Sequence, residues 1–151
     1  MKNYSVGYLG LCLLPFLLMT ACHSTPVSLE KASQTPSTRI LAFQDVNLPG
    51  NSRVTVIRDT GVGVPGCFVE IYVNETVAAR IDKGEKVTFF LSPGPLLLGV
   101  GPDLKGNPLC GYDPGNSTQI KTKLAPDEEK VFRISFSAGG TIHLSRDNAD
   151  P

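Results

Sequence analysis

The chain has little of what most enzymes and nucleic-acid-binding proteins need. Its 151 residues include no tryptophan and only two histidines, and charged residues make up 19% of it. The 14 basic and 14 acidic residues balance, so no excess of positive charge indicates binding to nucleic acid. The sequence contains no G-x-S-x-G, H-E-x-x-H or Walker-type motif. We therefore predict neither an enzyme nor a protein with a bound cofactor.

The chain also lacks an apolar stretch long enough to cross a membrane as a helix. Its most apolar segment covers residues 6–19, whereas a transmembrane helix needs about 20 residues. Lys2 precedes this segment, and the small residues Thr20 and Ala21 separate it from Cys22. This length and these flanks are typical of the hydrophobic region of a signal peptide.

The sequence LLMTACHS, residues 17–24, resembles the lipobox of bacterial lipoproteins, with Met19 where leucine is usual. The resemblance implies removal of residues 1–21 and acylation of Cys22 on its thiol and its new amino group. Several acyl chains anchor a protein firmly, since each buried methylene contributes about 0.8 kcal/mol. Because His23 and not aspartate follows the cysteine, the resemblance further implies an outer-membrane anchor with the domain in the periplasm. An ordinary secretory signal and a single-pass anchor are the alternatives.

The segment after Cys22 has the composition of a spacer. Residues 23–38, HSTPVSLEKASQTPST, are rich in Ser, Thr and Pro and show no sustained apolar period, so we expect no core there. We predict that residues 22–39 form a flexible tether between the lipid and the domain. The folded domain is expected to occupy residues 40–151.

Apolar residues alternate with polar ones from about Arg53 onward, the period of two that is typical of β-strands. In FVEIYVN we expect Val69, Ile71 and Val73 to face the core. Turn signals separate the successive runs, which are RVTVIR, FVEIYVN, VAARI, KVTFFL, LLLGV, KVFRISF and TIHL. No segment has apolar residues at a spacing of about 3.6 over the length of a helix. We predict an all-β fold, a small antiparallel β-sandwich of the Ig-like kind with about seven short strands.

Residues 69–100 resemble the PEGA-type domains of envelope lipoproteins. In that pattern a strand ending in V-x-V-N or V-D-G is followed by a hairpin, a glycine turn, P-G and another strand. The matching residues here are Val73, Asn74, Gly84, Pro93 and Gly94. Pro95 and Leu96 stand where the pattern usually has a histidine or tyrosine. The resemblance implies a small PEGA-like β-sandwich that binds or scaffolds other envelope components and carries no catalytic residues.

Two of the four cysteines remain for the folded domain. Cys12 lies in the signal segment and Cys22 is expected to carry lipid, which leaves Cys67 and Cys110. Two cysteines in an oxidising compartment favour one disulfide, and the chain-entropy model gives such a crosslink about 4 kcal/mol. Two free buried thiols are the alternative. We expect no metal site, because neither C-x-x-C spacing nor a nearby histidine is present.

Residues 99–119, GVGPDLKGNPLCGYDPGNSTQ, are predicted to form one long loop held at its middle by Cys110. Long loops in small domains are often functional, although a passive connection is the alternative. Five residues of this loop are candidates for contacting a partner: Asp103, Lys105, Asn107, Tyr112 and Asp113. Tyr112 would be the aromatic anchor of such an interface.

Two functions fit these features. The first is an accessory or scaffold lipoprotein that binds another envelope protein, or itself, through strand edges and the 99–119 loop. The second is a periplasmic inhibitor or immunity-type lipoprotein that blocks a partner enzyme. Glycan binding ranks lower, because the domain has only Tyr72 and Tyr112 as tyrosines and no tryptophan. His143 alternates with Ile142 and Leu144, so we expect it on the strand surface and not in catalysis.

Overall fold

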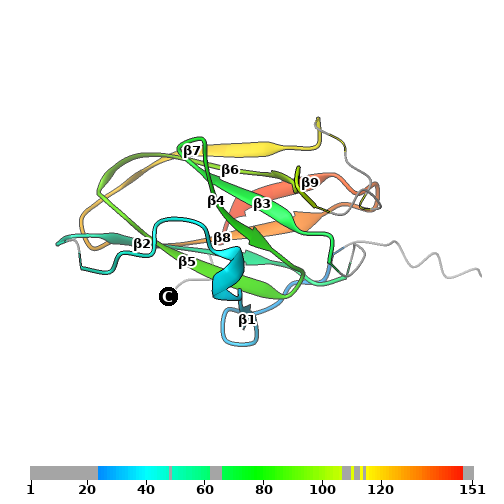
Figure 1. Ribbon diagram of the computed structural model, residues 1–151, viewed down its shortest axis with the longest axis horizontal. Helices are drawn as coiled ribbons and strands as arrows, with labels where there is room; N and C mark the ends of the chain where they lie inside the picture. Colours follow the sequence, from blue (N-terminus) through cyan, green and yellow to red (C-terminus); the bar gives the residue numbers. More distant parts are fainter. Residues whose placement is uncertain are drawn as a thin grey trace, which may run out of the picture.

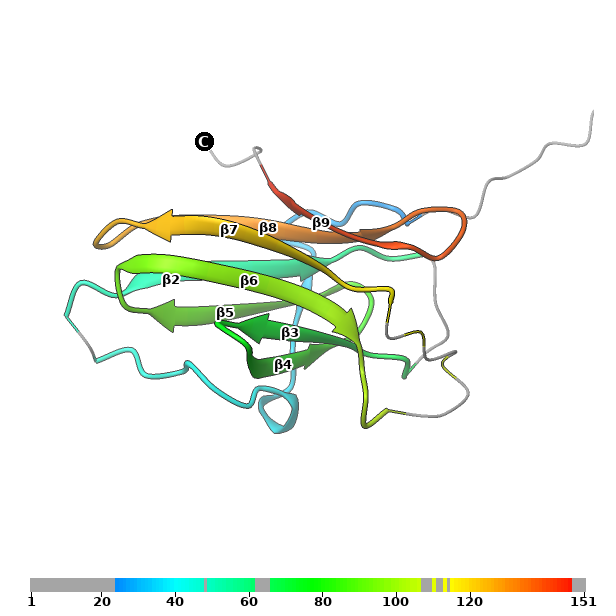
Figure 2. The ribbon, with the colours of Figure 1, turned by 90° about the horizontal axis from the view of Figure 1, so that it is seen from above.

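The computed structural model describes residues 24–47, 49–61, 66–106, 110, 113 and 115–147. Over this part of the chain two β-sheets pack face to face (Figure 1, Figure 2). The predicted all-β sandwich with one disulfide is confirmed, with nine strands instead of about seven. No helix in the described residues is long and apolar enough to span a membrane. Cys22 and the signal segment lie outside the described residues.

The first sheet has five strands in the order β1-β5-β2-β8-β9, and the second has four in the order β4-β3-β6-β7. The strands of the first sheet are β1 (Ser33–Gln34), β5 (Glu85–Leu91), β2 (Ser52–Arg58), β8 (Glu129–Phe136) and β9 (Ile142–Arg146). Those of the second are β4 (Thr76–Ile81), β3 (Val69–Val73), β6 (Gly94–Pro102) and β7 (Thr118–Leu124). A 3-10 turn, η1 (Ser37–Arg39), precedes β2.

The alternation of apolar residues places one face of each sheet in a shared core. Val69, Ile71 and Val73 face this core as expected, with at most 2% of each exposed. Its large, fully buried apolar side chains include Phe89, Phe132, Leu98 and Ile134. Burying a side chain of this size contributes roughly 1.5–3 kcal/mol, so this interface between the sheets is the main source of stability.

The first sheet is mixed and not purely antiparallel. β2 pairs antiparallel with β5 but parallel with β8, where Arg53 lies opposite Glu129 and Arg58 opposite Ile134. β1 also pairs parallel with β5. Parallel neighbours need a long crossover, and here the chain between β2 and β8 passes through every strand of the second sheet.

β7 lies where the sequence predicted the end of a loop. It pairs with β6 along its whole length, from Thr118 opposite Val100 to Leu124 opposite Gly94. The prediction of a loop over residues 99–119 is therefore wrong at both ends, and the connecting segment is 103–117. The run TQIKTKL has only Ile120 and Leu124 as apolar residues, so its alternation is weak.

Residues 24–35 join or pack against the first sheet, and η1 contacts β4 of the second sheet. The backbone N–H of Ser33 donates to the carbonyl of Gly84 (2.9 Å), and the N–H of Thr35 donates to the carbonyl of Lys86 (2.9 Å). Ala32 is only 5% exposed and lies in a small second core with Ile57 and Val131. The structure thus corrects the prediction of a flexible tether over residues 22–39 for its described part. The few apolar residues of the 24–39 segment cannot form a core alone, but they cover apolar side chains on the outer face of the first sheet.

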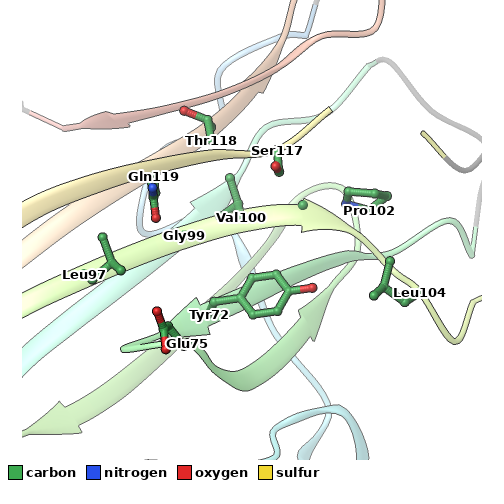
Figure 3. A pocket seen from close by; sticks show the side chains of 11 residues that line it. Tyr72, Glu75, Leu97, Gly99, Val100, Pro102, Leu104, Ser117, Thr118 and Gln119 are labelled. Carbon is green, nitrogen blue, oxygen red and sulfur yellow. The ribbon is translucent and has the colours of Figure 1, made fainter. Parts of the chain in front are cut away.

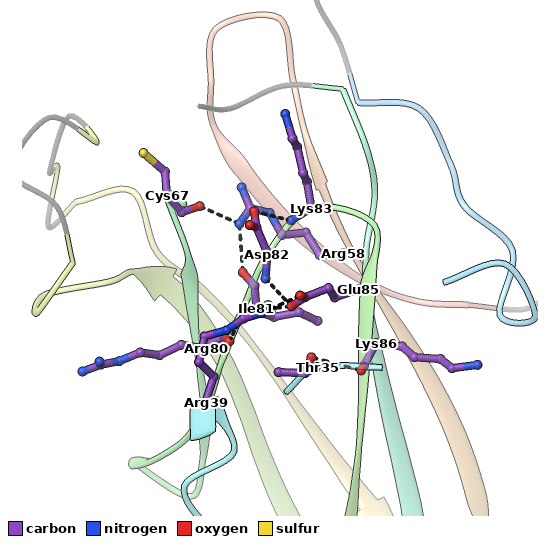
Figure 4. Close-up of polar contacts among 10 residues, drawn as sticks. All are labelled: Thr35, Arg39, Arg58, Cys67, Arg80, Ile81, Asp82, Lys83, Glu85 and Lys86. Atoms are coloured by element: carbon purple, nitrogen blue, oxygen red, sulfur yellow. Dashed lines mark hydrogen bonds and ion pairs between the residues drawn. The ribbon is translucent and has the colours of Figure 1, made fainter. Parts of the chain in front are cut away.

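Arg58 joins the two sheets at one end of the sandwich (Figure 4). Its Nη1 donates to the carbonyl oxygens of Cys67 (2.8 Å) and Ile81 (2.9 Å), and its guanidinium lies 5.2 Å from the ring centroid of Phe136. Burial lowers the pKa of Arg58 to about 10. The side chain therefore remains protonated at neutral pH and compensates its desolvation through carbonyls and a ring face.

The disulfide between Cys67 and Cys110 ties the residues before β3 to the 103–117 segment. We expect Cys67→Ala/Cys110→Ala to keep the β-sandwich, because the core between the sheets does not include either cysteine. Its free energy of unfolding should fall by about 2–4 kcal/mol, since the unfolded chain regains the entropy of an open loop. Urea unfolding followed by circular dichroism measures this loss, and an unchanged midpoint would contradict it.

Candidate functional site

A groove with a volume of about 430 Å³ runs along β6 on the outer face of the second sheet. Tyr72 and Glu75 lie on one side of it, and Ser117 and Gln119 on the other (Figure 3). Leu97 and Leu104 lie toward its two ends. The lining thus combines an aromatic ring and apolar side chains with a polar rim, which is the usual make-up of a binding pocket.

Two glycines of β6 create this groove. Gly99 lies between Tyr72 of β3 and Gln119 of β7 in the pairing register, and Gly101 lies opposite Glu70. Because neither glycine has a side chain, the backbone of β6 forms the floor. A Cβ atom on Gly99 would be 3.5 Å from the Cβ of Tyr72, and one on Gly101 would be 3.7 Å from Cε2 of the same ring. The missing side chains, not an unusual backbone conformation, therefore shape the site.

A buried polar cluster lies beside the tyrosine. The hydroxyl of Tyr72 donates to Oε2 of Glu70 (2.5 Å). Nε of Arg80 lies 3.6 Å from Oε1 of Glu70 and 3.4 Å from Oδ1 of Asp103. The carboxylate side chains are only 3% and 4% exposed. Two carboxylates share one guanidinium here, so this end of the groove carries a local excess of negative charge.

The five residues of the long loop that were predicted to contact a partner differ in exposure where the structure describes them. Asp103 does not point freely into solvent, since it pairs with Arg80. Its Oδ1 also accepts a hydrogen bond from the backbone N–H of Lys105 (3.0 Å). Lys105 and Asp113 are exposed. Asn107 and Tyr112 lie outside the described residues, so their predicted role stays a prediction.

The residues that make the groove were not predicted as a site from the sequence. Gly99 and Gly101 stand two apart in LLLGVGP, so they share one face of a strand. Glycine inside a strand often marks a place where another group approaches the backbone closely. This signal was present in the sequence, but it fell in the stretch that was assigned to a loop. Tyr72 was already expected on the face of β3 that points away from the core.

The two edges of the second sheet suit a partner less well than the groove does. On one side of the second sheet, the N–H groups of Leu41 and Ala42 donate to the carbonyl of Ala78 (2.8 and 3.3 Å), which covers the edge of β4. On the other side, β7 carries the exposed residues Lys121 and Lys123. Lysines on an outer strand oppose pairing with a further strand. The groove therefore becomes the leading candidate for the functional site.

His143 is exposed on β9 opposite Ser135, as predicted for a surface histidine. It lies on the first sheet, whereas the groove lies on the second. In the part of the chain that the structure describes, no group of three or more His, Cys, Asp or Glu residues is placed to hold a metal ion.

No known protein-family model matches the chain, and comparisons with curated protein sequences and with solved structures gave no match either. The lipobox and PEGA-type resemblances therefore stay predictions.

We expect Tyr72→Phe to lower the free energy of unfolding by about 1.5–3 kcal/mol, the range for a hydrogen bond to a charged group. The change removes the hydroxyl that donates to Glu70 and keeps the ring over the glycine floor. Urea unfolding measures the loss. Equal stability of the variant and the wild type would show that this hydrogen bond contributes nothing.

Proposed function

We propose that the protein is an outer-membrane-anchored periplasmic lipoprotein that acts as an accessory or scaffold protein. Its groove over β6 would dock a segment of another envelope protein. The observation that carries this proposal is the glycine-floored hollow beside Tyr72 on the outer face of a sheet. The lipobox and PEGA-type resemblances support the location and the scaffold role.

The chemistry of the groove indicates the kind of segment that would bind. Tyr72, Leu97 and Leu104 offer apolar surface, and Leu104 is 57% exposed. The exposed carboxylate of Glu75 lies on the rim, and the cluster around Glu70 adds negative charge. An apolar side chain lodged on a tyrosine, with a polar rim around it, is typical of an interface hot spot. We infer a partner segment that presents an apolar residue next to lysine or arginine.

The groove is braced before any partner arrives. The disulfide at Cys110 and the ion pair between Asp103 and Arg80 both hold the 103–117 segment to the body of the domain. A preformed site loses less conformational entropy on binding than a mobile one. The same bracing favours the alternative function, an inhibitor whose fixed loop blocks a partner enzyme.

Gly99→Val tests the docking site, because the added side chain would occupy the groove floor. A Cβ at this position makes only ordinary contacts, so we expect the variant to fold. In vivo crosslinking and pull-down should recover about tenfold less partner, the loss that accompanies roughly 1.4 kcal/mol of binding energy. Equal recovery from Gly99→Val and wild type would exclude the groove.

His143→Val is the matched control, since it adds a valine to an exposed strand position on the other sheet. It should recover as much partner as wild type. The identity of the partner then separates the two functions: an enzyme whose activity rises when it is released indicates an inhibitor, and a structural envelope protein indicates a scaffold.

Cys22→Ser tests the proposed anchor. Without a thiol for the lipid, the protein should lose incorporation of radiolabelled palmitate and move from the membrane fraction to the periplasmic fraction. Unchanged palmitate labelling and membrane association would contradict acylation at this cysteine. Cys12, in the segment that cleavage would remove, provides the matched control as Cys12→Ser.

A further inference from the structure

The amino-terminal end of the described chain is fixed to the sandwich at Ser24. The N–H of Ser24 donates to the carbonyl of Phe136 (3.1 Å), and the N–H of Phe136 donates to the Ser24 hydroxyl oxygen (2.9 Å). Thr25 and Thr60 exchange two backbone hydrogen bonds, of 2.7 and 3.0 Å. Ser24 is only 7% exposed. This is a built attachment and not the start of a loose spacer.

A partly buried ionic cluster holds the next residues. Nη1 of Arg133 donates to the carbonyl of Val27 (2.9 Å) and to Oδ1 of Asp59 (2.5 Å), while its Nη2 donates to Oδ2 of Asp147 (2.5 Å). The N–H of Val27 donates to the same Asp59 oxygen (3.3 Å). Asp59 is 2% exposed, so loss of its partner would leave a charge buried without compensation. Burial alone lowers the pKa of Arg133, but its hydrogen bonds to the two carboxylates raise it overall.

This attachment limits how far the domain can lie from a lipid on Cys22. Cys22 is two residues before Ser24, and two residues span at most ~7 Å. A free tether over residues 22–39 could extend on the order of 60 Å. The part of the sandwich that holds Ser24 must therefore lie at the lipid headgroups.

That part is one end of the sandwich, which we call the Ser24 end. It comprises the ends of β2 and β8, the turn at residues 82–84 and the hairpin at residues 137–141. Both views place the β8–β9 hairpin opposite the turns that join β5 to β6 and β7 to β8 (Figure 1, Figure 2). The hairpin at the Ser24 end, SAGGT, has no charge, whereas the turn between β7 and β8 contains Asp127 and Glu128. The other turn of the Ser24 end, residues 82–84, carries one charge of each sign, Asp82 and Lys83. These two turns therefore repel an anionic lipid surface less than the acidic turn between β7 and β8 does.

We propose that the sandwich sits directly on the bilayer in one orientation, with the Ser24 end against the lipid headgroups and the strands pointing away from the membrane. The inference rests on the proposed acylation of Cys22. It goes beyond anchoring, because it assigns the hairpin at residues 137–141 as a membrane-facing surface.

The test compares two labelled positions on the acylated protein in vesicles of phosphatidylethanolamine and phosphatidylglycerol. Gly139→Cys places a fluorophore in the hairpin, where a Cβ meets no atom within 4 Å. Ser92→Cys places it at an exposed site after β5, at the opposite end. The seven residues of β5 span roughly 23 Å at about 3.3 Å per residue. Energy transfer to a headgroup acceptor should therefore be at least about twofold higher from position 139 than from position 92.

The matched control inserts ten Gly/Ser residues between positions 23 and 24, which leaves the attachment of Ser24 intact. Such a linker has a typical end-to-end distance of roughly 17 Å, so it should bring the two transfer efficiencies close together. Flotation of the vesicles separates the outcomes. Protein that does not float overturns the acylation and, with it, the orientation. Protein that floats but transfers equally from both positions, without the inserted linker, overturns the orientation alone.

Discussion

Each sheet has one strongly apolar face, and the two faces can leave water only by packing on one another. Because the apolar faces pack on one another, the side chains that point the other way in each strand form the two outer faces of the sandwich. What these side chains are decides what each outer face can bind. The outer face of the first sheet still carries Ile57 and Val131, and residues 24–32 cover it. The outer face of the second sheet carries Tyr72 above Gly99 and Gly101, which leaves a hollow. One outer face thus binds the chain's own amino-terminal segment, and the other stays open.

Two arginines, the buried Arg58 and the partly buried Arg133, hold the chain together at the same end of this core. Arg58 is compensated by two carbonyls and a ring face, and its pKa falls to about 10 because desolvation dominates. Arg133 is compensated by the carboxylates of Asp59 and Asp147, and its pKa rises despite burial. Arg58 joins the sheets to each other, whereas Arg133 joins the amino-terminal segment to its sheet. Arg133 contacts residues that are far from it in the sequence, Val27 and Asp59, whereas the carbonyls that Arg58 contacts belong to residues 9 and 23 positions after it.

The separation of contacting residues along the sequence explains which features could be predicted. A strand such as 69–73 has strong alternation, and Cys67 and Cys110 were the only cysteines available to each other, so both features could be predicted. β7 could not be predicted, because its apolar residues alternate only weakly. Its pairing with β6, which the sequence does not show, makes it a strand. The parallel pairing of β2 with β8, the ion pairs of Arg133 and the place of Asp103 depend on tertiary contacts that no local pattern encodes. Of the groove, the glycine spacing in β6 and the outward face of Tyr72 could be predicted from the sequence.

The pairing register of the second sheet has a consequence for assembly. The groove floor is part of β6, which pairs residue by residue with β3 and β7. The shared core and Arg58 fix this sheet to the first sheet, to which Ser24 is attached, so the floor cannot slide relative to Ser24. In the proposed orientation the distance between the groove and the lipid headgroups is therefore fixed. A partner would then be selected by where along the membrane normal it displays its segment as well as by its sequence. Because successive side chains of a strand point to opposite faces, only changes of two residues keep the groove on the outer face, so the height could change only in steps of roughly 6.6 Å.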